Sequence, residues 1–378
     1  MVIYLDSAAT TLQKPPAVSR AAARAVSTCA NPGRSGHRPA LRAAEIVYDC
    51  REEAAAFFGI ERPERVVFTQ NATHSLNLAI KSLLHGGGHA VISGYEHNSV
   101  VRPLEALAER GVTYTTAVSP LFDPAAVCRA VEAALRPDTR CVILNHVSNV
   151  FGFILPLEQI DDLCAEKGLP LIVDASQSAG VLPLDVRTLR AAAFVCMPGH
   201  KALYGPQGTG ILLCCQDKNL YSLIEGGTGS LSLETRQPDF LPDMLESGTL
   251  NVPGIAGLRE GIRFVARERE AICRREARLL RRAAEGLSQL PELEVYCSDS
   301  CQSGVLSFRS RRIDPSDLCQ MLAGRGVCLR GGLHCAPLAH RSGGTLPEGT
   351  ARLSVSAFTT PAEVEKFLQI LKDLLKSA

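Results

Sequence analysis

The chain has 378 residues, with 40 Lys or Arg against 39 Asp or Glu, so its formal net charge is +1. A chain so close to neutrality lacks the strongly basic character typical of nucleic-acid and membrane-surface binding, and we expect neither partner. Hydrophobic residues make up 46% of the chain and charged residues 21%, which excludes a mainly disordered protein. The length favours two domains or one large one.

Targeting and cysteine patterns point to a reducing compartment. No apolar run approaches the roughly 20 residues of a membrane-spanning helix. The start, MVIYLDSAATT, has neither the basic nor the apolar region of a secretion signal, so we expect a cytoplasmic protein. The 14 cysteines are scattered, several of them in apolar stretches, which favours reduced thiols over a disulfide framework. No Cys-x-x-Cys pair occurs, and we expect no metal site.

Short β-rich runs alternate with amphipathic segments from about residue 64 to 215. The β-rich runs are RVVFTQ, HAVISG, VTYTTAV, RCVILNH, LPLIVDAS, AAFVCM and TGILLCC. Strand–helix alternation of this kind predicts a mostly parallel sheet covered by helices on both faces. The predicted fold class is α/β.

After residue 250 the pattern changes to a smaller α+β unit. The expected elements are a long charged helix at about 255–289, strands LEVYC and GVLSFRS, a helix near 315–324, a strand VCLRGG and a final helix PAEVEKFLQILKDLL. We predict a large domain of residues 14–252 and a small domain made of residues 1–13 and 253–378. No flexible linker separates them, so the two should share a cleft.

Asp174 ends the apolar run LPLIVD, at the strand end where ligands of such sheets bind. An unpaired carboxylate is costly to bury there. Asp174 therefore either caps the following segment or pairs with a cation such as a protonated pyridine nitrogen. Gln177 follows three residues later.

Lys201 lies in the turn GHKALYGPQG between two apolar strands, beside His200. Most lysines are solvated surface charges. In a turn between core strands, however, burial can lower the pKa of the amine enough for Schiff-base chemistry. The spacing does not fit a nucleotide P-loop.

Thr73 and His97 each follow another predicted strand. FTQNATHSLNLAI has the strand–turn–helix form in which helix N–H groups and the hydroxyl of Thr73 can hold a phosphate, although a plain helix cap has the same pattern. His97 in SGYEHNSV is either a structural histidine or a residue facing the same rim.

Cys335 stands in RGGLHCAPLAH, after a glycine pair and His334 and close to Arg330. This polar, flexible setting favours a thiolate more than a helix or strand interior would. The residues alone leave a nucleophilic and a structural cysteine equally open.

Together, these segments resemble the fold type I, class V aminotransferase-like enzymes that use pyridoxal 5′-phosphate (PLP), most closely the cysteine desulfurases related to selenocysteine lyases. The ordered motifs are YLDSAATT, FTQNATHSLNLAI, EHNS, HVSNVFG, VDASQSAG, GHKALYGPQGTG, ESGTLN, RGGLHCA and ARLSVSAF. The resemblance runs nearly end to end. It implies a homodimer with the active site at the subunit interface.

The resemblance also assigns roles toward the cofactor. It implies that Lys201 holds PLP through a Schiff base, that Asp174 pairs with the pyridine nitrogen and that Gln177 bonds the phenolic oxygen. It implies that the His97 ring stacks on the cofactor ring. The implied phosphate ligands are Thr73, His200 and, from the neighbouring subunit, Thr249.

On the substrate side, the resemblance implies that Asn149 and Arg352 receive the α-carboxylate, for which a bidentate guanidinium is suited. Arg330 would line the same pocket. Two positions depart from the family pattern. Pro198 replaces a serine that commonly bonds the phosphate, and Phe358-Thr359 stands where the family has Tyr-Asn.

The implied reaction converts L-cysteine to L-alanine, with Lys201 moving the Cα proton and Cys335 taking the sulfur as a persulfide for an acceptor protein. A selenocysteine lyase, acting on L-selenocysteine, or a related C–S or C–Se lyase is the alternative. A homologue that only binds a partner is a further hypothesis, which Pro198 suggests.

Overall fold

A seven-stranded sheet forms the largest part of the computed structural model, which describes residues 2–33, 35–216 and 220–377. Its strand order is β2-β8-β7-β6-β5-β3-β4. All neighbouring strands are parallel except that β8 runs antiparallel to β2 and β7. The strands are β2 (Val66–Thr69), β3 (Gly88–Ser93), β4 (Val112–Ala117), β5 (Thr139–Asn145), β6 (Leu171–Asp174), β7 (Ala192–Pro198) and β8 (Gly210–Cys214). The predicted α/β fold with a mostly parallel sheet is confirmed.

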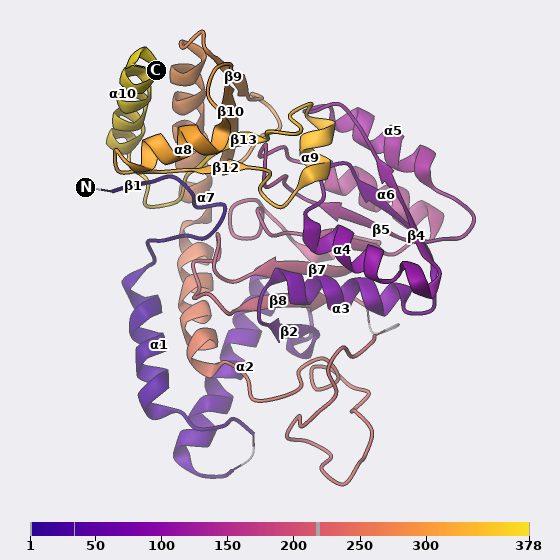
Figure 1. The fold of residues 1–378 in the computed structure, drawn as a ribbon. Coiled ribbons are helices and arrows are strands. Elements are labelled where there is room, and N and C mark those ends of the chain that lie inside the picture. The colour runs from indigo at the N-terminus through magenta and orange to yellow at the C-terminus, as the bar shows by residue number, and fades with distance from the viewer. Residues whose placement is uncertain (1, 34, 217–219, 378) are drawn as a thin grey trace.

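Helices cover both faces of this sheet (Figure 1). Successive strand residues point to opposite faces, so Ala90 and Ile92 pack in one core and Val91 in the other. The first core lies under α3 (Ala72–Leu84) and α4 (Asn98–Ala106), and the second under α2 (Arg38–Phe58), α5 (Pro124–Ala134) and α6 (Leu157–Lys167). Single turns of 3-10 helix lie at η1 (Pro63–Arg65), η2 (Ala108–Arg110) and η3 (Val186–Thr188).

A four-stranded antiparallel sheet, in the order β12-β13-β10-β9, forms the second unit. Its elements are β9 (Leu293–Tyr296), β10 (Val305–Ser310), α8 (Pro315–Ala323), β12 (Arg330–Gly332), α9 (Pro337–Ser342), β13 (Thr350–Ser354) and α10 (Pro361–Ser377). Leu318 of α8 and Phe367 of α10 pack in one core with Phe308 of β10. This arrangement fits the expected α+β unit.

The segment VCLRGG departs from the single strand expected there. It divides into β11 (Val327–Cys328), which pairs in parallel with β1 (Ile3–Tyr4), and β12, which joins the four-stranded sheet. Leu329 separates the two short strands: β11 before it pairs with the start of the chain, and β12 after it pairs with β13. The boundaries of the two domains, 14–252 and 1–13 with 253–378, stay a prediction. The pairing of the chain start with β11 supports the assignment of residues 1–13 to the small domain.

Helix α7 (Val252–Ser288) connects the two units. Its 37 residues span about 55 Å at 1.5 Å per residue. Ile255 packs in the core of the large sheet, whereas Leu279 and Leu287 pack in the core of the second unit. The first half of α7 lies against α1 (Pro16–Thr28) and α2, two helices that lie outside the alternating pattern from which the sheet is predicted.

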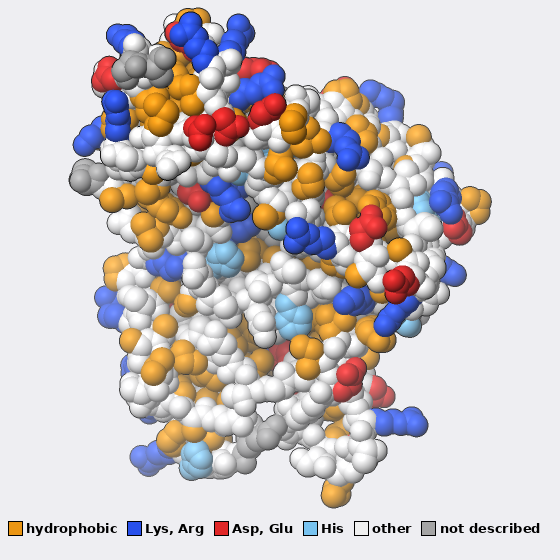
Figure 2. Space-filling model, in the orientation of Figure 1, with side chains coloured by type: hydrophobic (Ala, Val, Ile, Leu, Met, Phe, Trp, Pro, Cys, Tyr) orange, Lys and Arg blue, Asp and Glu red, His pale blue; other side chains and the backbone are white. Residues whose placement is uncertain are grey.

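The surface charge, the helices and the cysteines agree with a mixed-charge protein without disulfide bonds among the described residues. Side chains of both charge signs are intermingled on the face seen in Figure 2. Among the described residues, none of the helices combines the length and the apolar character needed to cross a bilayer. No disulfide bond joins the cysteines of the described chain.

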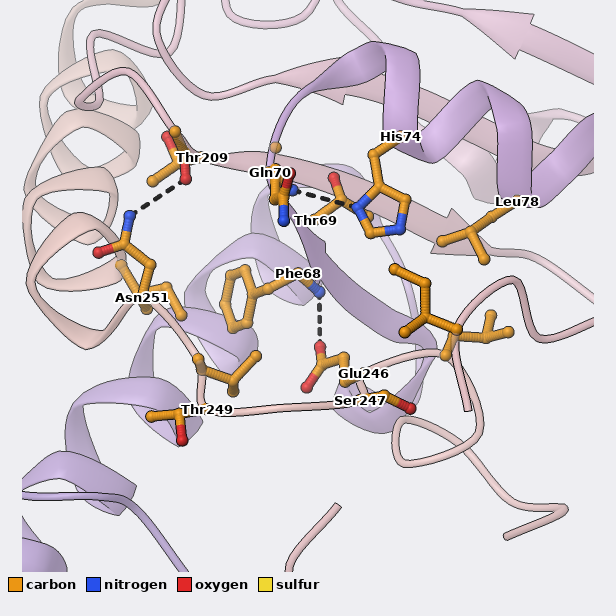
Figure 3. A pocket seen from close by; sticks show the side chains of 16 residues that line it. Phe68, Thr69, Gln70, His74, Leu78, Thr209, Glu246, Ser247, Thr249 and Asn251 are labelled. Carbon is orange, nitrogen blue, oxygen red and sulfur yellow. Dashed lines mark hydrogen bonds between the residues drawn. The ribbon is translucent and has the colours of Figure 1, made fainter. Parts of the chain in front are cut away.

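A buried ion pair fastens α2 and β2 to the segment that precedes Thr249. Both terminal nitrogens of Arg51 lie 2.8 Å from the two carboxylate oxygens of Glu246. Glu246 also accepts a hydrogen bond from the backbone N–H of Phe68, as Figure 3 shows. Arg51 and Glu246 are 6% and 8% exposed, so each charge depends on the other for compensation.

We predict that Glu246→Gln lowers the free energy of unfolding by about 3 kcal/mol or more, because it leaves the Arg51 guanidinium buried without a counter-charge. Urea denaturation measures the loss. Glu270→Gln is the matched control, because its pair with Arg274 is solvent-exposed and such pairs contribute less than about 1 kcal/mol. Equal losses in the two variants would contradict this account.

Candidate active site

A cavity of about 110 Å³ opens at the carboxyl ends of β5, β6 and β7. The strand ends are level there, because Asn145 pairs with Asp174 and Asp174 with Cys196. The cavity gathers seven of the residues predicted from the sequence: Thr73, His97, Asn149, Asp174, Gln177, His200 and Lys201. The remaining lining residues are Asn71, Ala72, Ser99, Asn145, Val147, Ser176 and Pro198.

Lys201 and Asp174 form the electrostatic centre of this cavity. Burial lowers the pKa of the Lys201 amine to about 8, although the nearby Asp174 carboxylate opposes the shift. Burial also raises the pKa of Asp174, against the opposing effects of the Ser176 N–H and Lys201. The Ser176 N–H donates to Asp174 Oδ1 at 2.9 Å. Asp174 therefore caps the segment that follows it and also lies near a cation, Lys201, so both interpretations of this residue apply. About a tenth of the Lys201 amine is therefore neutral at pH 7, far more than for an ordinary lysine, and a nucleophilic amine must be neutral.

His97, Ser99 and Thr73 form a hydrogen-bonded chain along one wall. The Ser99 N–H donates to His97 Nδ1 at 3.1 Å, so the neutral ring carries its proton on Nε2. The Ser99 hydroxyl lies 2.9 Å from His97 Nδ1 and 2.8 Å from the Thr73 hydroxyl. Burial lowers the pKa of His97 to about 4, and the charge of Lys201 adds to the shift. His97 is therefore a neutral ring held at a fixed angle.

The first turn of α3 and His200 supply further donors to the cavity. Ala72 and Thr73 belong to that first turn, whose N–H groups have no partner inside the helix. The helix dipole makes this end favourable for an anion. His200 Nδ1 lies 3.1 Å from the Thr10 hydroxyl, and burial lowers the pKa of the ring to about 4.

Arg352 does not line the cavity but bonds two distant parts of the chain, one of them the cavity residue Asn149. It extends from β13, is 2% exposed, and donates to Asp6 Oδ1 at 2.8 Å and to the carbonyl of Asn149 at 2.9 Å. Arg352 Nε and Asn149 Oδ1 are buried and have no hydrogen-bond partner among the described residues. An unsatisfied buried polar atom costs about 1–3 kcal/mol, so a ligand that bonded these atoms would recover part of that cost.

Cys335 is an exposed residue of a loop that two hydrogen bonds fasten to the site. The Asn149 side-chain amide donates to the carbonyl of His334 at 2.9 Å. The N–H of Asn98, next to His97, donates to the carbonyl of Cys335 at 2.8 Å. The thiol is solvent-exposed, in contrast to the buried cysteines of the core. The loop thus lies beside the cavity although Cys335 does not line it.

Two predicted residues lie elsewhere. Thr249 is exposed and lines a separate cavity of about 180 Å³ between β2, α3 and the segment before α7, which Figure 3 shows. Its predicted role toward a neighbouring subunit's phosphate stays a prediction. Arg330 is exposed on β12, where it pairs in register with Arg352.

Several residues of the site were not expected from the sequence. Asp6 holds Arg352, and Ser99 links His97 to Thr73. Glu96 is fully buried and accepts from the Ser93 hydroxyl at 2.5 Å and the Asn145 N–H at 2.8 Å; burial raises its pKa to about 8. Asp6 and Ser99 lie within the motifs YLDSAATT and EHNS, so their place in these motifs is the sequence feature that could have indicated them.

A family model described as Aminotransferase class-V matches residues 3–367. The chain belongs to the aminotransferase class-V family. The resemblance inferred from the motifs is confirmed at this level.

Relatives and solved structures agree with this assignment. Proteins named "Probable cysteine desulfurase" from Methanothermobacter thermautotrophicus and Pyrococcus abyssi are each 31% identical, over 98% and 100% of this chain and 94% and 95% of their own length. The apo structure of a cysteine desulfurase from Thermococcus onnurineus NA1 superposes with a TM-score of 0.91 at 30% identity, covering 100% of this chain and 95% of that one. The expected fold, fold type I of the PLP-dependent transferases, is confirmed by this match.

The lowered pKa of Lys201 predicts a pH-dependent stability difference in the ligand-free protein. Between pH 8 and 10.5 the Lys201 amine is protonated in the unfolded state but neutral in the folded state, so the free energy of unfolding rises with pH. Below pH 8 the folded protein buries a charged amine and bears the full cost of that burial. Above pH 10.5 the amine is neutral in both states and this cost is absent. Lys201→Met should therefore be more stable than wild type at pH 7, by up to about 3 kcal/mol, and lose this advantage as the pH rises.

Chemical denaturation of both proteins across that pH range measures the difference. Lys14, whose pKa burial also lowers to about 8, is present in both proteins and cancels. A difference that stays constant from pH 7 to 10.5 would show that the amine of Lys201 is not perturbed.

Proposed function

We propose that this chain is a PLP-dependent cysteine desulfurase that releases L-alanine from L-cysteine and takes the sulfur on Cys335. The observation that carries the proposal is the docking of the Cys335 loop, through Asn98 and Asn149, beside a cavity that holds Lys201 and Asp174. The names of the relatives support this activity over that of a selenocysteine lyase.

The residues of the cavity fit PLP by their chemistry. Lys201 offers a partly neutral amine for a Schiff base, and Asp174 a buried carboxylate for a protonated pyridine nitrogen. Gln177, whose Nε2 donates to the carbonyl of Ala8 at 3.0 Å, is the predicted partner of the phenolic oxygen. His97 is a neutral ring suited to stacking. When bound, PLP would supply the electron sink for a carbanion at the substrate Cα.

Phosphate binding would depend on donors other than Pro198, which lines the cavity but offers neither a hydroxyl nor an N–H. Thr73, His200 and the first turn of α3 are the donors available within the chain. Thr249 of a second copy would complete the set if the protein is the homodimer that the family resemblance implies.

Substrate binding would use the buried Arg352 and Asn149. The guanidinium is fixed by Asp6 and by the carbonyl of Asn149, so it is preorganised to receive a carboxylate. With PLP and substrate bound, Lys201 would take the Cα proton on Nζ. Its lowered pKa suits a group that accepts and then returns a proton near neutrality.

Sulfur transfer would be carried out by Cys335. Its thiolate Sγ attacks the substrate sulfur, an S–S bond forms, and the Cβ–S bond breaks with its electron pair left on carbon. A proton then adds to Cβ, which gives L-alanine and a Cys335 persulfide. Because the thiol is exposed, a sulfur-acceptor protein could reach the persulfide directly.

We predict that Cys335→Ala abolishes alanine release from L-cysteine under excess reductant but retains the visible absorbance of bound PLP. Cys297→Ala is the matched control, because Cys297 is also exposed but lies in the loop after β9. Alanine release by Cys335→Ala at the wild-type rate would refute the nucleophile. Comparing wild-type rates on L-cysteine and L-selenocysteine tests the lyase alternative, which requires the selenium substrate to be strongly preferred.

A further inference from the structure

The residue before the proposed nucleophile has a buried and well-defined side chain. His334 is 4% exposed, and its Nε2 lies 3.0 Å from the carbonyl oxygen of Thr350 on β13. A carbonyl only accepts, so the neutral ring carries its proton on Nε2. Nδ1 is buried without a hydrogen-bond partner among the described residues. Because an apolar side chain would avoid that unpaired atom, packing alone does not explain a histidine here.

The backbone that this ring supports has an unfavourable conformation. His334 and Cys335 have φ angles of 49° and 58°, in the left-handed region that side chains with a Cβ disfavour. Two such residues in succession persist only where the surroundings fix them. Asn149 and Asn98 hold the two carbonyls from the large sheet's side, and the bond from the His334 ring to Thr350 adds an anchor from the second unit.

The anchor of His334 continues into a network that returns to the site. The Thr350 hydroxyl lies 2.9 Å from that of Ser307, and the Ser307 hydroxyl donates to the carbonyl of Val150 at 2.7 Å. Val150 adjoins Asn149. A second buried ring, His340, lies 5.6 Å from His334 between centroids, and its Nδ1 lies 2.7 Å from the Thr345 hydroxyl. The His334 ring is therefore packed against a second imidazole.

We propose that His334 is a positioning residue for Cys335: its Nε2–H bond to the carbonyl of Thr350 holds the left-handed backbone that presents the thiol to the substrate sulfur. This inference rests on the proposed function, in which Cys335 is the nucleophile. Burial lowers the pKa of His334 well below its usual value, and Arg352 adds to the shift, so the ring is neutral at working pH. Neutral replacements therefore test the hydrogen bond without changing the charge.

The test compares His334→Phe, which keeps a ring but has no donor, with His334→Gln, whose side-chain amide can replace the Nε2–H donor. His89→Phe is the matched control, because His89 is also a fully buried histidine with hydrogen bonds to Thr139 and Thr115, but on β3. Each PLP-loaded protein is examined by hydrogen–deuterium exchange of the peptide spanning residues 331–337 and by kcat and KM for alanine release from L-cysteine.

We expect His334→Phe to speed exchange in this peptide by about tenfold, as loss of one hydrogen bond implies. Its kcat should fall by about tenfold or more, because a misplaced nucleophile loses rate, while KM changes less than about threefold. His334→Gln should remain within about threefold of wild type in both readouts, and His89→Phe should leave both unchanged. His334→Met carries the same test if His334→Phe does not fold.

Unchanged exchange in His334→Phe, or an equal defect in His334→Gln, would overturn the proposal. Faster exchange with an unchanged kcat would also overturn it, because the anchor would then not serve the reaction. Failure of the proposed function has a different signature, namely alanine release that survives in Cys335→Ala.

Discussion

The arrangement of the two sheets and the chain start depends on the hydrogen bonds of one buried group, the guanidinium of Arg352. It extends from the small antiparallel sheet, pairs with Asp6 near the start of the chain and donates to the carbonyl of Asn149 beside the large sheet. A cation that is 2% exposed is stable only with such partners, so the three segments must meet at one place. The proposed substrate site lies where they meet.

The level strand ends of the large sheet supply the rest of the site. Parallel strands bring Asn145, Asp174 and the turn with Lys201 to one edge, where they line a common cavity. Burial there lowers the pKa of the Lys201 amine and raises that of the Asp174 carboxyl. The fold that buries these two groups therefore also sets their reactivity, because burial disfavours the charged form of each.

The sequence predicts the parts of this structure that depend on local pattern. Alternating apolar runs predict the large sheet, and the motifs predict the side chains that gather at its edge. Contacts between distant segments are not encoded locally: nothing in VCLRGG indicates that β11 pairs with the start of the chain while β12 joins another sheet. The pairing of Asp6 with Arg352, 346 positions apart, and the anchor of His334 on Thr350 are of the same kind. Such interactions require the folded chain.

The most direct test of the account is a single turnover of the PLP-loaded protein with L-cysteine and no reductant, followed by peptide mass spectrometry. The account predicts that the peptide with Cys335 gains the mass of one sulfur atom, in an amount that matches the alanine released. Alanine formed with the added sulfur on another cysteine, or on none, would contradict it.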